Sequence, residues 1–167
     1  MVNISQVITQ DDIEAVQELL FEYLSWATGQ AKALYHQDVD VDEMLSHSMS
    51  EINVFSPPSG CILLARVDGE AAGMAFMKPI RENACEIKRM YVRPKYRGNK
   101  IGRSLLDQLI QIAKEIGYSM ILLDSAQFMK AAHPLYRSVG FLEVEPYAEA
   151  EMPDDFHKHM VFMKLEL

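Results

Sequence analysis

The spacing of apolar residues changes early in the chain. Val2–Ile8 favours a short strand, whereas the next segment places apolar residues three and four positions apart, as one face of a helix requires. The apolar positions of this helix are Ile13, Val16, Leu19, Leu20, Tyr23 and Leu24. Asp11 or Asp12 is expected to cap its start, and Gly29 is expected to close it.

The next elements are a short helix and a hairpin. A helix is predicted over Val41–Met49, with Asp40 as its N-cap. The loop Phe55–Gly60 follows, because its paired prolines stop both helix and sheet. Cys61–Val67 and Ala71–Met77 then form two antiparallel strands around an Asp-Gly-Glu turn.

The centre of the chain predicts a strand, a loop and a long helix. After a polar turn, Ala84–Val92 has the pattern of a strand, and Arg93–Lys100 has that of a loop. Ile101–Ile116 is amphipathic and Gly117 ends it. The apolar face of this helix carries Leu105, Leu106, Leu109, Ile112, Ala113 and Ile116.

The last part alternates strand and helix. Met120–Leu123 is wholly apolar, which is typical of a strand buried on both faces. Lys130–Ser138 is predicted to be a helix that ends at Gly140, and Phe141–Glu145 and His159–Leu165 are predicted to be strands. This order indicates a mixed α/β (α+β) fold, and residues 1–167 are expected to form a single domain.

Charge is unevenly distributed. The formal net charge of −8 argues against nucleic acid as a partner. Yet residues 78–103 hold nine of the sixteen basic residues and only two acids. A basic segment in an acidic protein favours a local anionic ligand, although a solvated basic face would give the same pattern.

Several classes of protein are disfavoured. No apolar run is long enough for a membrane helix, and the first ten residues lack a signal-peptide pattern, so a cytoplasmic location is expected. Two cysteines, Cys61 and Cys85, make no disulfide framework, and neither has a neighbouring His to activate it. The five histidines have no metal-like pairing, so no metal site is expected.

The segment from Tyr91 to Gly102 leaves a strand and enters a helix. First-turn N–H groups of a helix have no internal partners, and a glycine-containing loop lets the backbone approach an anion closely. Gly98 and Gly102 fit this arrangement, and a diphosphate is the natural ligand. Alternatively, the two glycines make a turn and a close packing contact. Neither a Walker loop nor a Gly-x-Gly-x-x-Gly fingerprint is present.

Three segments in order resemble those of GNAT-type N-acetyltransferases. Arg97–Gly102 resembles the family's Arg/Gln-x-x-Gly-x-Gly/Ala loop, Glu86–Pro94 its central strand, and Ala131–Phe141 its last helix and turn. The resemblance implies a mixed, mostly antiparallel sheet of about seven strands, splayed at the middle and flanked by about four helices. It also implies acetyl-CoA as co-substrate and suggests a homodimer.

The resemblance assigns a role to each part of the co-substrate site. Backbone amides would bind the diphosphate of coenzyme A, and the central strand would pair with its pantetheine arm, with Ser125 as a secondary contact. The amide of Met90 or Tyr91 could also stabilise the oxyanion. The residues implied are Met90, Tyr91, Val92, Arg97, Gly98, Asn99, Lys100, Ile101, Gly102, Arg103, Ser104, Ser125 and Tyr136. Lys100 stands where the family prefers glycine, and we expect it in ordinary helical geometry, where it adds a cation.

The resemblance also implies the chemistry. Glu86 would accept the proton of the amine, directly or through a water, and Tyr136 would protonate the departing thiolate. Alternatively, Glu86 is a surface carboxylate that pairs with Lys88 or Arg89, and Tyr136 is a packing aromatic. The acceptor pocket is expected between the first two helices and the acidic segment after Phe141, which would favour a cationic amine or would merely be solubilising.

The function expected from these features is transfer of an acetyl group from acetyl-CoA to a small primary amine, by direct transfer in a ternary complex. Acetylation of a protein N-terminus or lysine, a non-catalytic acyl-CoA sensor, and a nucleotide-binding module are the alternatives.

Overall fold

The computed structural model describes residues 1–167, and its centre is a seven-stranded sheet in the order β1-β2-β3-β4-β5-β7-β6. All neighbouring pairs are antiparallel except β4 and β5. The strands are β1 (Val2–Gln6), β2 (Cys61–Val67), β3 (Glu70–Arg81), β4 (Ala84–Val92), β5 (Met120–Ala126), β6 (Leu142–Val144) and β7 (Met160–Glu166). The splayed, mostly antiparallel sheet predicted from the sequence is therefore confirmed.

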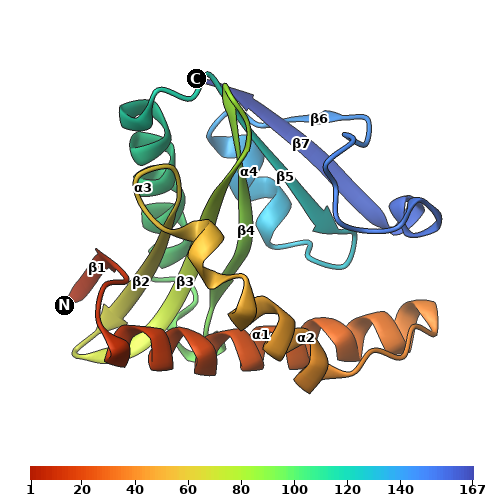
Figure 1. Ribbon diagram of the computed structural model, residues 1–167. Coiled ribbons are helices and arrows are strands. Elements are labelled where there is room, and N and C mark those ends of the chain that lie inside the picture. The colour runs from red at the N-terminus through yellow and green to blue at the C-terminus, as the bar shows by residue number, and fades with distance from the viewer.

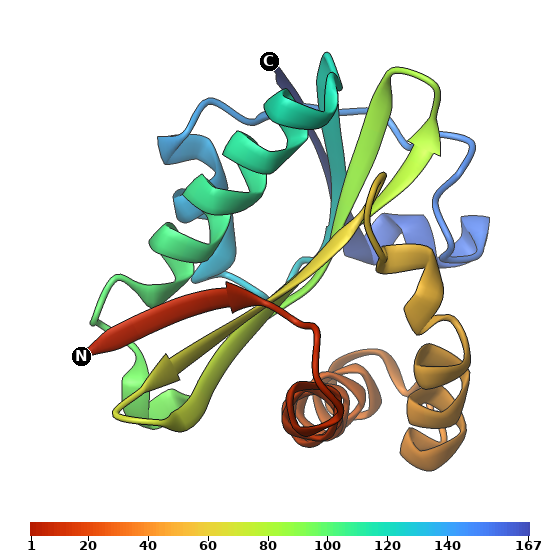
Figure 2. The same cartoon turned by 60° about the vertical axis from the view of Figure 1, so that its left-hand side comes forward.

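Helices cover both faces of this sheet. The four α-helices are α1 (Gln10–Tyr35), α2 (Val41–Ser50), α3 (Ile101–Ile116) and α4 (Ala132–Ser138). Short 3-10 turns are η1 (Ile52–Phe55), η2 (Pro94–Tyr96) and η3 (Asp154–His159). Figure 2 shows α1 and α2 on one side of the sheet and α3 and α4 on the other. No helix is both long and apolar enough to cross a membrane.

Each face of the sheet has its own apolar core, because successive strand residues point to opposite sides. On the α3 side, Leu105, Leu106 and Leu109 pack against strand residues such as Ile87 and Met77. On the α1 side, a separate core surrounds Phe55 and Phe76. Both cores hold β4 in place, and β4 is the strand that carries most of the predicted site.

β4 and β5 stay together for only part of their length. Their parallel pairing runs from Ala84 opposite Met120 to Glu86 opposite Leu122 and then stops. Beyond that point the two strands diverge, as Figure 1 shows. The rest of β5 pairs only with β7, so the edge of β4 after Glu86 has no strand beside it.

A bulge lies in β4 where the strands part. Lys88 is opposite Phe76 and Tyr91 is opposite Met74, so β4 has one residue more than β3 between these pairs. Arg89, inside the bulge, has φ 51°. Because the extra residue changes the alternation of side chains, both Lys88 and Arg89 face the α1 side, where they line one cavity.

The first helix differs from its prediction at both ends. Its N-cap is Thr9, in a reciprocal capping box with Asp12, so the prediction that an aspartate caps it was wrong. Gly29 does not end the helix, which continues to Tyr35 before His36 turns left-handed. A helical glycine costs only about 1 kcal/mol relative to alanine, and the strong helix formers after Gly29 outweigh that cost.

The other predicted elements are found close to their expected positions. Val41–Met49 is confirmed with Asp40 as N-cap, and α3 has the predicted bounds, with Gly117 at its end. α4 begins later than expected, at Ala132, and β5 runs on to Ala126 instead of ending at Leu123. The extra residues of β5 matter, because Asp124 and Ser125 lie in them.

Candidate functional site

The open edge of β4 contains three residues that the sequence assigned to the pantetheine arm. Met90, Tyr91 and Val92 lie after the bulge, where β4 pairs with β3 on one side only. The side chain of Tyr91 packs in the α1 core, 5.9 Å from the ring of Tyr23, whereas Met90 and Val92 pack toward α3. The backbone edge is thus fixed by packing on both faces and can accept one more extended segment.

The loop between β4 and α3 presents a run of free amides. No backbone N–H from Gly98 to Arg103 has an acceptor within the chain, and α3 has no side chain that caps its start. The amides at either end of this run are engaged, since Arg97 donates to Pro94 and Ser104 donates to Lys100. The assignment of the Arg97 and Ser104 amides to the diphosphate stays a prediction, and each of these two amides already has a backbone acceptor in this chain.

Lys100 does not have the geometry expected of it. It is the N-cap of α3 in the left-handed region, with φ 60° and ψ 11°. The expectation of ordinary helical geometry was wrong, because the loop turns left-handed at Lys100 as well as at Gly98, which has φ 85°. A side chain at this backbone conformation is strained, which explains why glycine is preferred at the corresponding position.

The side chains around this loop leave its amides uncovered. Arg97 turns back and donates from Nε to the carbonyl of Val92 at 3.0 Å. Arg103 is held along α3 by Asp107, at 2.8 Å from Nε to Oδ1. A Cβ on Gly102 would lie 3.4 Å from Leu135, which is an ordinary contact, so the packing at this glycine leaves room for a methyl group.

A cavity of about 510 Å³ lies where β4 and β5 diverge. Its walls come from α1, α2, the bulge of β4, the end of β5 and the segment 151–160. Its location agrees with the prediction of a pocket between the first two helices and the acidic segment after Phe141. Its volume is in the usual range for a site that binds a small molecule.

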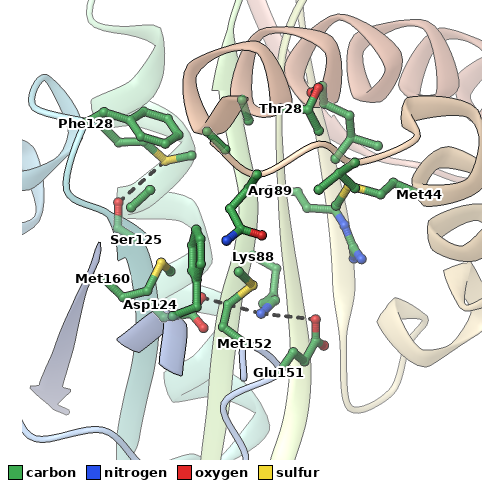
Figure 3. Close-up of a pocket in the computed structure, with 18 of the residues that line it drawn as sticks. Thr28, Met44, Lys88, Arg89, Asp124, Ser125, Phe128, Glu151, Met152 and Met160 are labelled. Carbon is green, nitrogen blue, oxygen red and sulfur yellow. Dashed lines mark hydrogen bonds and ion pairs between the residues drawn. The ribbon is translucent and has the colours of Figure 1, made fainter. Parts of the chain in front are cut away.

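Lys88 is at the centre of the charged groups in this cavity. Its Nζ lies 3.5 Å from Asp124 Oδ1, 3.4 Å from Glu151 Oε2 and 3.5 Å from Glu86 Oε1. Figure 3 shows Lys88 between Asp124 and Glu151, with Met152 beside it and Met44 across the cavity. Burial alone would lower the pKa of Lys88, but the three carboxylates outweigh it and raise that pKa, so the ammonium stays charged.

Glu86 lies behind this cavity and does not line it. Its side chain is 0% exposed, and its Oε2 accepts a hydrogen bond from the hydroxyl of Tyr147 at 2.6 Å. Burial raises the pKa of Glu86, while Lys88 and Tyr147 oppose the shift. The alternative of a surface carboxylate is wrong, although the pairing with Lys88 that it invoked is present.

Tyr136 and Ser125 come from the two elements on the far side of the divergence. Tyr136, on α4, is buried, and burial raises the pKa of its phenol, with smaller contributions from Tyr23 and Asp124. A raised pKa keeps the hydroxyl protonated and able to donate. Ser125 lines the cavity, and its Oγ lies 3.0 Å from Nε2 of the buried His133.

Three residues to which the sequence analysis gave no part in the chemistry belong to this site. Asp124 lines the cavity, and its Oδ2 is buried without a hydrogen-bond partner. Tyr147 holds Glu86, and Arg89 lines the cavity from the bulge. Asp124 had a sequence signal, as a charged residue directly after the apolar run that starts β5. The contacts of Tyr147 and Arg89 at the site needed the tertiary structure.

Comparison with known proteins agrees with this geometry. The model of the acetyltransferase (GNAT) family matches residues 14–141. An N-acetyltransferase of Schizosaccharomyces pombe is 34% identical over 168 residues, covering 99% of this chain and 95% of that protein. N-acetylaspartate synthetase of Homo sapiens is 32% identical over 100 residues, covering 58% of this chain and only 33% of that protein.

A solved structure has the same fold over its whole length. The PaiA N-acetyltransferase of Thermoplasma acidophilum, determined in complex with coenzyme A, superposes with a TM-score of 0.76 and 19% identity. The match covers 100% of this chain and 99% of that one.

Proposed function

Since the chain belongs to the acetyltransferase (GNAT) family and is an acetyl-CoA-dependent acyltransferase, we propose that its acceptor is the primary amine of a small molecule. The acetyl group would move directly from thioester to amine in a ternary complex. One observation carries the proposal: the free amides of Gly98 to Arg103 lie at the end of β4 that parts from β5, and the cavity lies in the same opening.

The co-substrate fits the groups that this chain leaves unpaired. The amides from Gly98 to Arg103 would bind the diphosphate at the positive end of α3. The open edge of β4 at Met90, Tyr91 and Val92 would pair with the pantetheine arm, with Ser125 on the opposite strand. The bulge at Arg89 directs Lys88 and Arg89 away from that edge and into the acceptor cavity.

Proton removal from the amine is assigned to the charged groups around Lys88. Asp124 is the carboxylate at the divergence that lines the cavity, so it would accept the proton as the amine nitrogen attacks the acetyl carbon. Glu86 would be a second proton acceptor behind Asp124. Both carboxylates belong to one charged cluster, because Lys88 Nζ lies 3.5 Å from an oxygen of each. The raised pKa of Glu86 makes it a better proton acceptor than an exposed glutamate.

Collapse of the intermediate breaks the carbon–sulfur bond and leaves a thiolate. Tyr136 would give its phenolic proton to the sulfur as the electron pair moves there, and the proton from the amine restores the site through solvent. The acceptor enters as an ammonium and loses one proton to solvent before it attacks. The proton that Asp124 then takes from the amine replaces the one that Tyr136 gives to the sulfur, so the products are the amide, the free thiol and that one released proton. The burial of Tyr136 keeps it protonated until the thiolate forms.

The cavity and a relative both favour a small acceptor over a protein. α1, α2 and the segment 151–160 wall the cavity, and a volume of about 510 Å³ suits a molecule with the size of a metabolite. N-acetylaspartate synthetase, whose name specifies a small N-acetylated product, is similar to this chain. Because this chain matches only about a third of that relative, we do not assign the relative's acceptor to this chain.

An acceptor panel tests the proposal. Free thiol release from acetyl-CoA is measured with small primary amines, free amino acids and peptides that carry a free N-terminus or a lysine. We expect turnover with small amines and little with peptides, and Gly102→Glu serves as the background control. Activity on peptides alone would contradict the proposal, and so would acetyl-CoA binding without turnover of any amine, which is the behaviour of a sensor.

A further inference from the structure

Arg89 is a cation of the cavity wall that forms no ion pair within the protein. Its guanidinium is absent from the ion pairs that surround the cavity, which join Lys88 and Lys78 to Glu86, Asp124 and Glu151. Its Nη1 is buried and has no hydrogen-bond partner. An arginine cannot discard its proton to escape this cost, so an anion from outside the chain is the natural partner.

The backbone at Arg89 is held in a costly conformation that keeps this group at the cavity. Its φ of 51° is in the left-handed region, where a side chain that is not glycine, asparagine or aspartate is uncommon. The guanidinium carbon lies 5.3 Å from the ring centroid of Phe55 and 5.7 Å from that of Phe76. The two rings hold the guanidinium, but they supply no charge and no strong acceptor.

The opposite charge lies on the strand across the divergence. Asp124 lines the same cavity, and its Oδ2 is a buried acceptor without a donor. Lys88 and Lys78 place two ammonium groups among three carboxylates, so one negative charge of this cluster is left over. The cavity therefore has one site for an anion, at Arg89, and one site for a cation, at Asp124.

Apolar side chains form most of the remaining wall. Met44 comes from α2, Met129 follows β5, and Met152 and Phe156 lie in the segment 151–160. Methionine side chains are flexible and polarisable, and they adapt to apolar groups of different shapes. The segment 151–160 also places Glu151 and Asp155 on the wall, which disfavours a second carboxylate on the ligand.

From these features we propose that the acceptor is a free amino acid with an apolar side chain, such as methionine. Its carboxylate would pair with the guanidinium of Arg89, its ammonium would approach Asp124, and its side chain would pack against the methionines. The inference rests on the proposed function, since it names the acceptor class of the same cavity. Arg89 is then a residue that determines specificity.

Binding can be tested apart from catalysis. The protein is saturated with coenzyme A, which carries no acetyl group, and titrated by calorimetry with L-methionine, L-methioninamide or L-aspartate. The amide removes the carboxylate charge and keeps the amine and the side chain. We expect methionine to bind at least about 10-fold more tightly than its amide, as loss of a charge-assisted hydrogen bond implies, and more tightly than aspartate.

Variants of Arg89 decide which group causes this preference. Arg89→Gln should bring the affinities for methionine and its amide within about 2-fold of each other. Arg89→Lys should keep part of the difference, because lysine retains the charge but loses the paired N–H donors of the guanidinium. Lys114→Gln, which removes an exposed cation of α3, should leave the preference unchanged. Affinity for acetyl-CoA and the melting temperature verify that each variant is folded.

Equal affinity of the unmodified protein for methionine and its amide would overturn the inference, as would a preference that survives Arg89→Gln, or no binding of methionine at all. These results would leave the proposed function intact, provided that amines without a carboxylate are still acetylated. Conversely, methionine binding that depends on Arg89 would stand even if no amine were turned over.

Discussion

The loop before α3 and the cavity behind the diverging strands offer different groups for the recognition of a ligand. The loop offers backbone N–H groups of consecutive residues, from Gly98 to Arg103, and its side chains turn away or pair elsewhere. The cavity offers side chains from helices, strands and a distant segment, and its charges are partly buried. A contiguous backbone site tolerates many side chains, whereas a site assembled from distant side chains depends on each of them.

The largest effect is expected in the loop. Gly102→Glu places a carboxylate at the start of α3 against the diphosphate, and the affinity for coenzyme A should fall by more than about 100-fold, since like charges at short range cost several kcal/mol. Gly102→Ala is the matched control and should bind within a few-fold of the unmodified protein, because its Cβ would meet only an ordinary contact. Calorimetric titration with coenzyme A measures both. Normal affinity in the glutamate variant would remove the loop from the site.

In the cavity, the largest effect should come from the carboxylate at the divergence. Asp124→Asn should lower turnover about 100-fold or more, as loss of a general base does. Asp155→Asn changes another carboxylate of the same cavity and should have little effect. Glu86→Gln should lower turnover less than Asp124→Asn, since Glu86 does not line the cavity. A larger loss in Glu86→Gln would make Glu86 the principal base.

Tyr136 would connect the two regions, because we propose that it protonates the sulfur that lies between them. Tyr136→Phe should lower turnover about 100-fold by removing the proton donor, while the affinity for coenzyme A stays within about 2-fold. Steady-state kinetics and calorimetry separate these quantities. Unchanged turnover would leave Tyr136 with a packing role beside Phe141.

An ion pair at the cavity also makes the stability of the protein depend on pH. Burial alone would raise the pKa of Glu151, but Lys88 and Lys78 outweigh it and hold that pKa at about 2. A lowered pKa stabilises the fold above the ordinary glutamate pKa of about 4.3, and this contribution is lost as the pH falls toward about 2.

Because Glu151 is 41% exposed, Glu151→Gln should cost only about 1 kcal/mol of unfolding free energy at pH 7. Urea unfolding at pH 7, 5, 4 and 3 should show the difference between variant and unmodified protein shrinking as the pH falls. Glu145→Gln changes an exposed carboxylate without an ion pair and should cause little change at any of these pH values. A constant difference across this range would contradict the charge explanation.

The smallest effect concerns Lys100, where the left-handed backbone is strained because the residue has a Cβ. Lys100→Gly should raise the free energy of unfolding by about 0.5–1 kcal/mol, because glycine adopts the left-handed region without a Cβ penalty. Lys100→Ala retains the Cβ and should bring no such gain. Both variants lose the same charge, so both should weaken binding of coenzyme A by a similar small factor. Chemical denaturation that shows equal stability of the two variants would argue against strain at this position.

The order of elements, the bounds of α3 and the residues of the proposed diphosphate loop follow from the sequence alone, because helix periodicity, caps and glycine turns are local. The spacing between motifs also indicated the family. The charge pattern identified a basic segment, but it did not indicate which of the basic residues form ion pairs.

The tertiary structure alone decided the rest. Glu86 is enclosed by Tyr147, which lies 61 positions away, and Lys88 gathers carboxylates from three different segments. The bulge at Arg89 places the successive cations Lys88 and Arg89 on one face of the sheet. The alternation of a regular strand would place them on opposite faces. The environment of a buried charge depends on residues distant in sequence, and the sequence carries no local signal of which of them will meet.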